Sequence, residues 1–191
     1  MTEKLAPSDR SISGPFDSSE VELPAGFLDF GSIRVGSDPN IAISLEVSEE
    51  TGKGVALTFD LEDSKLQVVA AASSKHEGIW ADAITQLADS IRSSGGVVEE
   101  FNSPLGRGIN ASIPQSKTTN RLVRFIGVDG PRWFLRGTVT GAAVIDPIAY
   151  QAVEGLFRSL VIHRGESPMP PREPLELVVP AGIITPPRPG N

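Results

Sequence analysis

A stretch in the second half of the chain most constrains its fold. Residues 121–141 read RLVRFIGVDGPRWFLRGTVTG, in which two apolar runs meet at Asp129-Gly130. This dipeptide favours a tight hairpin turn, because glycine tolerates positive φ and aspartate can hydrogen-bond its own backbone. With the usual turn, Ile126 would face Trp133 across the hairpin, and both faces would be mainly apolar. The stretch therefore predicts two antiparallel strands in the centre of a sheet.

The same hairpin carries several arginines around one tryptophan. Arginine is costly to hold near a core without a partner, so the group is either a binding surface or a satisfied internal network. As a binding surface, the guanidinium groups would hold phosphate or carboxylate and the indole would stack on a ligand. As a network, they would pair with acidic side chains, and most such clusters are of this structural kind. The candidate binding residues are Arg124, Asp129, Arg132, Trp133 and Arg136.

Charge and composition exclude several classes of protein. The formal net charge is −7 at pH 7, whereas general nucleic-acid binding needs a basic face. The chain has no cysteine, which excludes disulfides, thiolate nucleophiles and zinc sites built on sulfur. No signal-peptide core or membrane-spanning apolar window is found. We therefore expect a cytoplasmic protein that binds neither membrane nor nucleic acid.

The remaining pattern predicts an α+β fold, with a mostly antiparallel sheet packed against two helices. One helix would begin at a capping box, Ser74 and Glu77, and end at Gly95-Gly96. The other has Asp146 as N-cap and Pro147 at its first position. Besides the hairpin, strands are expected at residues 33–35, 40–47, 55–61, 65–72, 97–101, 105–113 and 160–163.

Both ends of the chain differ from its middle. Residues 1–22 are polar and rich in acidic groups, and they predict a disordered arm. Residues 165–191 are rich in proline and predict a tail. Within that tail, the apolar segment 174–180 would dock on the domain surface or on an open sheet edge. A single α+β domain is expected between them, over residues 23–164.

A search for reaction chemistry returns no complete motif. The chain has only two histidines, His76 and His163, and neither has a second ligand at metal spacing. No H-E-x-x-H, G-x-S-x-G or phosphate-binding glycine motif occurs. We therefore expect no metal and no cofactor. The missing motifs weigh against an enzyme without deciding the question.

Several segments resemble a known family. Residues 124–137, RFIGVDGPRWFLRG, resemble the signature of the DUF3710 proteins, an uncharacterised and mainly actinobacterial family. Residues 78–80 (GIW) are similar to its G-L-W-like motif, and residues 158–165 (RSLVIHRG) to its closing segment. The resemblance covers roughly residues 20–180, and residues 81–83 (ADA) depart from the usual helix opening. It implies a bacterial cytoplasmic α+β protein and no particular activity.

These observations favour a non-enzymatic binding or adaptor domain. Its hairpin would recognise a protein partner or a small anionic ligand. The alternative is an enzyme of unrecognised type acting on a phosphorylated small molecule, with Asp129 or His163 as proton carrier. A pocket that holds Asp129, two arginines and a histidine together would favour that alternative. A third possibility is an interaction protein that uses residues 175–179 and the acidic arm.

Overall fold

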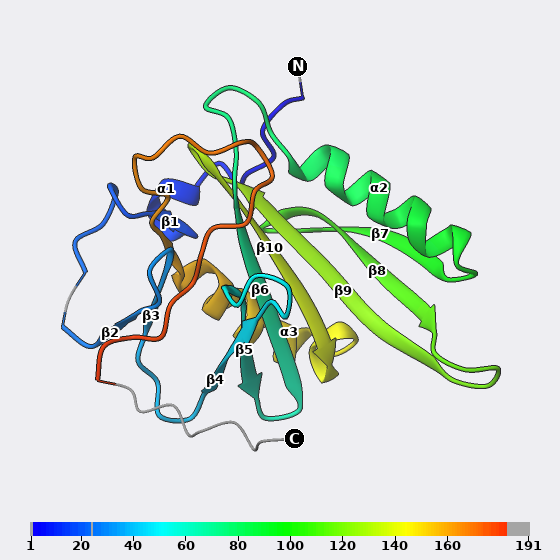
Figure 1. Ribbon diagram of the computed structural model, residues 1–191. Coiled ribbons are helices and arrows are strands. Elements are labelled where there is room, and N and C mark those ends of the chain that lie inside the picture. Colours follow the sequence, from blue (N-terminus) through cyan, green and yellow to red (C-terminus); the bar gives the residue numbers. More distant parts are fainter. Residues whose placement is uncertain (1, 24, 183–191) are drawn as a thin grey trace.

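The computed structural model describes residues 2–23 and 25–182 (Figure 1). Its centre is a seven-stranded antiparallel sheet with the strand order β4-β5-β6-β10-β9-β8-β7. Its strands are β4 (Ala42–Val47), β5 (Gly54–Leu61), β6 (Ser64–Ala72), β7 (Val97–Ser103), β8 (Gly106–Pro114), β9 (Asn120–Asp129) and β10 (Trp133–Gly141). A smaller mixed sheet has the order β1-β11-β3-β2, formed by β1 (Phe16–Asp17), β2 (Phe27–Asp29), β3 (Ile33–Gly36) and β11 (Val161–Ile162). The expected α+β class with a mostly antiparallel sheet is confirmed.

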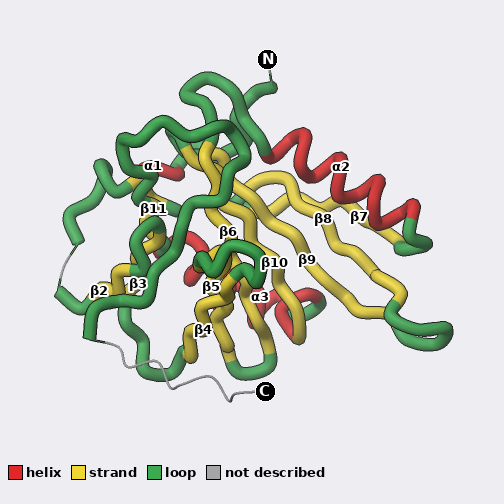
Figure 2. Tube along the Cα trace, in the orientation of Figure 1, coloured by secondary structure: helices red, strands yellow, loops and turns green. Residues whose placement is uncertain are grey.

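The main helices lie on opposite faces of the large sheet (Figure 2). Helix α2 (Trp80–Ser93) covers β7, β8 and β9. The indole of Trp80, at its start, stacks on Phe134 with ring centroids 5.7 Å apart. Helix α3 (Pro147–Ser159) covers the other face together with the small sheet. The short 3-10 helix η1 (Ala142–Val144) precedes α3, and α1 (Arg10–Ser13) lies near the N-terminus. Each face therefore buries its own apolar cluster.

The central hairpin is confirmed, but its register is not the expected one. Leu135 pairs with Val128, so the predicted pairing of Ile126 with Trp133 is wrong. The turn is centred on Pro131 and Arg132 and is closed by Gly130 N donating to Trp133 O over 2.8 Å. A turn centred on Asp129-Gly130 would need an N–H on Pro131 to donate to Val128 O, and proline has none. The observed register differs from the expected one by an even number of residues. Each side chain therefore stays on the face of the sheet where it was predicted.

The two helices test two predicted starts. Asp146 accepts a hydrogen bond from Ile148 N over 2.9 Å, and α3 begins at Pro147 as expected. The predicted capping box is wrong. Ser74 Oγ accepts from Glu77 N over 2.8 Å, but in a turn that precedes the helix, which begins at Trp80. The apolar stripe of α2 and its end before Gly95, which has φ +81°, are as predicted.

Segments near both ends of the described chain, β1 and residues 174–178, lie against the sheets (Figure 1). Where the sequence predicts a disordered arm, the structure has α1 and β1, and β1 pairs with β11. Part of the segment 174–180 bonds to the large sheet: Leu175 N donates to Ala70 O over 2.9 Å and Leu177 N to Gly54 O over 3.0 Å. The remainder of the tail, residues 183–191, lies outside the described residues. The division into arm, domain and tail stays a prediction.

Candidate functional site

The structure does not bring the arginines of the hairpin together. Arg124 lies near the start of the hairpin, on the face that carries α3. Arg136 lies on the face that carries α2. Arg132 lies in the turn, at the end where the N-terminal segment and the tail meet. The expected single cluster of arginines around Trp133 is therefore wrong, and each residue has its own environment.

Asp129 is a buried structural acceptor. It is 2% exposed, and Oδ1 accepts from Ile79 N over 2.8 Å. Oδ2 accepts from Leu5 N over 2.9 Å. Trp80 N lies 3.3 Å from both oxygens. The carboxylate therefore receives the first free N–H groups of α2, which is the task of a helix cap. The hairpin supplies the cap that the helix's own sequence lacks.

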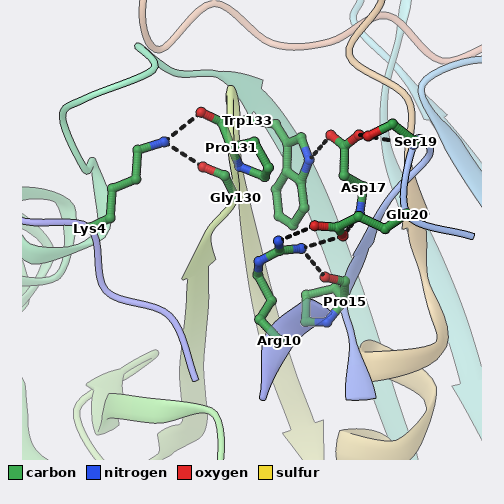
Figure 3. Close-up of polar contacts among 9 residues, drawn as sticks. All are labelled: Lys4, Arg10, Pro15, Asp17, Ser19, Glu20, Gly130, Pro131 and Trp133. Carbon is green, nitrogen blue, oxygen red and sulfur yellow. Dashed lines mark hydrogen bonds and ion pairs between the residues drawn. The ribbon is translucent and has the colours of Figure 1, made fainter. Parts of the chain in front are cut away.

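Trp133 is a core anchor with one polar contact (Figure 3). Its side chain is fully buried in the cluster beneath the small sheet. Its Nε1 donates to Asp17 Oδ2 over 2.9 Å. The guanidinium of Arg10 lies 5.7 Å from the ring centroid. The indole therefore offers no open face on which a ligand could stack, and its N–H has the partner that a buried tryptophan needs.

The N-terminal segment fixes the turn of the hairpin in place (Figure 3). Lys4 Nζ donates to Gly130 O over 2.5 Å and to Pro131 O over 2.7 Å. Partial burial lowers the pKa of this lysine, although Asp129 counteracts part of that effect. On the other side of the turn, Arg10 forms an ion pair with Glu20. Lys4 therefore holds the turn itself, whereas Arg10 lies beside Trp133, the first residue of β10.

Arg124 is satisfied within the protein. Its Nε donates to Asn110 Oδ1 and its Nη2 to Val144 O, both over 2.8 Å. The guanidinium carbon lies 4.6 Å from the ring centroid of Phe101 and 4.3 Å from that of Tyr150. Burial lowers the pKa of Arg124, and Tyr150 opposes that shift. This arginine is held by amide, carbonyl and aromatic groups.

Arg136 lies half-buried beside a small hollow of about 200 Å³ under the first turn of α2. Its Nε has no hydrogen-bond partner within the described residues. Burial lowers its pKa. Arg172 borders the same hollow, but its Nη2 lies 3.6 Å from Asp82 Oδ2. Apolar side chains form most of the remaining wall, so the hollow offers few polar partners for a hydrated ion.

Arg132 reaches a second hollow, of about 330 Å³, beside the hairpin turn. Its Nη2 donates to Gly165 O over 3.0 Å. Arg164 borders the same hollow, with Nη1 donating to Ser167 O over 2.9 Å. Burial lowers the pKa of Arg164, the like charge of Arg132 lowers it further, and the charge of Glu173 opposes the shift. Over residues 2–23 and 25–182, neither arginine forms an ion pair.

The remaining wall of this hollow is mixed in charge. Asp17 and Glu166 border it, but both oxygens of Asp17 are used, one by Ser19 and the other by Trp133. His163 lies beside the arginines with its Nδ1 2.9 Å from Ser18 Oγ. The enzyme alternative needs Asp129 in this hollow. Asp129 instead lies buried against α2, so the expected grouping of that carboxylate with His163 is not formed.

A third and larger hollow, of about 610 Å³, adjoins the second one. The segment 163–165 borders both. The larger hollow lies between the β2–β3 turn, the β4–β5 turn and the docked tail. Two orphaned polar atoms occur on its wall: Ser32 Oγ and Arg164 Nε have no partner in the described chain. Reasoning from sequence missed both residues, because only the fold brings residues 31–32, 48–55 and 163–176 together.

Neither a metal site nor a membrane-spanning helix is found among the described residues. In the described ranges, no three metal-ligating side chains gather closely enough to hold an ion. Likewise, none of the helices seen in residues 2–23 and 25–182 has the length and apolar character needed to span a bilayer.

Comparison with known proteins places the sequence in a family without giving it an activity. Residues 14–185 match the sequence model described as "Protein of unknown function (DUF3710)". The match includes the hairpin, the segment 163–165 and the docked tail. Neither a curated protein nor a solved structure matches the chain.

Proposed function

Because the chain belongs to the DUF3710 family, whose description names no activity, we propose a function from the geometry alone. We propose that the protein is a non-enzymatic binding domain for a small anionic ligand. The anionic group, a phosphate or a carboxylate, is held between Arg132 and Arg164. This proposal keeps the turn of the hairpin as the recognition element and gives Arg124, Asp129 and Trp133 structural tasks.

The observation that carries the proposal is that two arginines border one hollow and neither forms an ion pair in the described chain, although Asp17 and Glu166 border the hollow as well. Arg132 and Arg164 both border the hollow beside the turn, and each donates to a backbone carbonyl. Two like charges in a partly buried hollow repel each other, and a bound anion would convert that repulsion into attraction. Guanidinium groups match phosphate and carboxylate geometry and can donate two hydrogen bonds to one group.

The surroundings support binding because they hold the arginines in place before a ligand arrives. Lys4 fixes the turn on one side, and the bond from Trp133 to Asp17 fixes β10 against β1. Arg132 also bonds to the backbone of Gly165, which joins the turn to the segment carrying Arg164. A preorganised site loses less conformational entropy on binding.

The experiment is isothermal titration calorimetry with inorganic phosphate and pyrophosphate at fixed ionic strength. We expect Arg132→Gln and Arg164→Gln each to weaken binding by at least about tenfold, since a charge-assisted hydrogen bond contributes about 1.5–3 kcal/mol. The matched control is Arg121→Gln, which removes the same charge from an exposed position at the far end of the hairpin. Equal losses in all variants, or no binding by the wild type, would contradict the proposal.

A further inference from the structure

The larger hollow indicates what kind of anion the site takes. We infer that the ligand is a soluble amphipathic anion, with its charged group at Arg164 and an aliphatic body in the 610 Å³ hollow. This inference rests on the proposed function, since it uses the same arginines for the charged group. It adds the chemistry of the remainder of the ligand.

The shared wall gives the first reason. Arg164 borders both hollows, together with its neighbours at 163 and 165. A ligand whose charged group lies at this wall can therefore extend into the larger space. A volume of about 610 Å³ lies within the range of small-molecule sites, which is about 300–1,000 Å³. Inorganic phosphate alone would leave most of it to water.

The lining side chains give the second reason. The apolar part of the wall consists of Val55, Met169, Pro174 and Leu175. No phenylalanine, tyrosine or tryptophan borders the hollow in the described chain. His163 and Arg164 border the hollow only at the wall that it shares with the second one, whereas the apolar remainder of the wall offers methyl and methylene groups, which suit aliphatic chains. Methionine adapts readily to irregular apolar shapes.

A buried hydroxyl gives the third reason. Ser32 is 7% exposed, it borders the larger hollow, and its Oγ has no hydrogen-bond partner among the residues described. Buried polar atoms are rarely left unpaired, and an exception calls for an explanation. Its position on the wall fits an oxygen of the ligand near the charged group. Ser32 and Arg164, the two residues that carry these orphaned atoms, both border the cavity.

The test compares octyl phosphate with inorganic phosphate by calorimetry, below the concentration at which octyl phosphate forms micelles. Each buried methylene group strengthens binding about fourfold, so we expect octyl phosphate to bind at least about tenfold more tightly. Met169→Trp narrows the hollow and should remove this gain while phosphate affinity is unchanged. Val55→Phe serves as a second blocking variant on a different element, β5.

The outcomes separate the inference from the proposed function. Phosphate binding without any gain from the octyl chain overturns the inference and leaves the anion site standing. Binding of neither compound overturns both. Equal binding of octanol and octyl phosphate also overturns both, because the charged group would then contribute nothing.

A second arm distinguishes a free amphiphile from a lipid headgroup. Vesicles of phosphatidylcholine with phosphatidic acid present the same phosphate chemistry in a bilayer. The hollow is bordered by the β4–β5 turn and the docked tail, and the net charge of −7 disfavours an anionic bilayer, so we expect no co-sedimentation of the protein with these vesicles. Co-sedimentation that is lost in Arg164→Gln would overturn the assignment to a soluble ligand.

Discussion

The two ends of the β9–β10 hairpin use the same residue type in opposite ways. At one end, Arg124 donates to Asn110 and to Val144 O and lies against two aromatic rings. At the other end, Arg132 donates to one backbone carbonyl and borders an open hollow with a second arginine. Arg124 is half-buried, whereas Arg132 is exposed. The two arginines also differ in the number of hydrogen bonds that they donate within the protein, which is two for Arg124 and one for Arg132.

The comparison teaches how an arginine-rich sequence segment can be divided between structure and recognition. Strand β9 carries Arg124 inward, where the protein supplies acceptors for it. The turn carries Arg132 to the place where the N-terminal segment and the tail converge. We expect substitutions at the first kind of position to change the free energy of unfolding. Substitutions at the second kind should change ligand affinity instead.

The largest expected effect concerns Asp129, which lies at the turn end but is structural. Asp129→Ala leaves Ile79 N and Leu5 N without their acceptor in a buried place. We expect a loss of about 3 kcal/mol in the free energy of unfolding, measured by urea denaturation. Asp63→Ala, at an exposed position in the β5–β6 turn, is the control. A loss no larger than in the control would show that the cap contributes little.

The next largest loss of stability is expected at Arg124, which lies near the start of the hairpin, away from its turn. Arg124→Gln removes the contacts with both rings and loses at least one of the two charge-assisted hydrogen bonds. We expect a loss of about 2 kcal/mol in urea denaturation. Arg132→Gln makes the same chemical change at the turn of the hairpin, and its free energy of unfolding should stay within about 0.5 kcal/mol of the wild-type value. Similar losses in the two variants would remove the distinction between the ends.

The pH dependence of the free energy of unfolding tests how Asp17 holds Trp133 beside the turn. Burial raises the pKa of Asp17, but hydrogen bonds from Ser19 and Trp133 outweigh it, so the pKa lies below its ordinary value of 3.8. A lowered pKa in the folded state gives stability that is present above the unfolded value and lost as pH falls through the folded one. The stability difference between wild type and Asp17→Asn should therefore be constant above about pH 5 and shrink below about pH 4. Urea denaturation at several pH values measures it, and a difference that grows in acid would contradict the assignment.

The smallest effect is expected at Arg136. Its Nε has no partner within the described chain, and burial lowers its pKa. A partly desolvated charge without a partner stabilises little, so Arg136→Met should change the free energy of unfolding by no more than about 0.5 kcal/mol. A loss near that of Arg124→Gln would show that Arg136 is held by an interaction not described above. Thermal denaturation at two salt concentrations would then identify its electrostatic part.

Local pattern predicted the elements better than their contacts. Asp146-Pro147 predicted the start of α3 to the residue, because a cap and its helix are neighbours in sequence. The start of α2 was wrong, because its cap is Asp129, which belongs to the hairpin and lies 50 positions away from Ile79. The predicted register of the hairpin was wrong because Pro131 lacks the N–H that a turn centred on Asp129-Gly130 needs. The pairing of Arg132 with Arg164 depends on β11 and the tail meeting the turn, which no local pattern encodes.

The measurement that tests the central claim most directly is the gain in the free energy of unfolding on adding phosphate at constant ionic strength. A ligand that binds only the folded state raises the free energy of unfolding by RT ln(1 + [L]/Kd), where [L] is the free ligand concentration. The account predicts the same gain in the wild type and in Arg124→Gln, and almost none in Arg132→Gln. An undiminished gain in Arg132→Gln, or its loss in Arg124→Gln alone, would contradict the division of tasks along the hairpin.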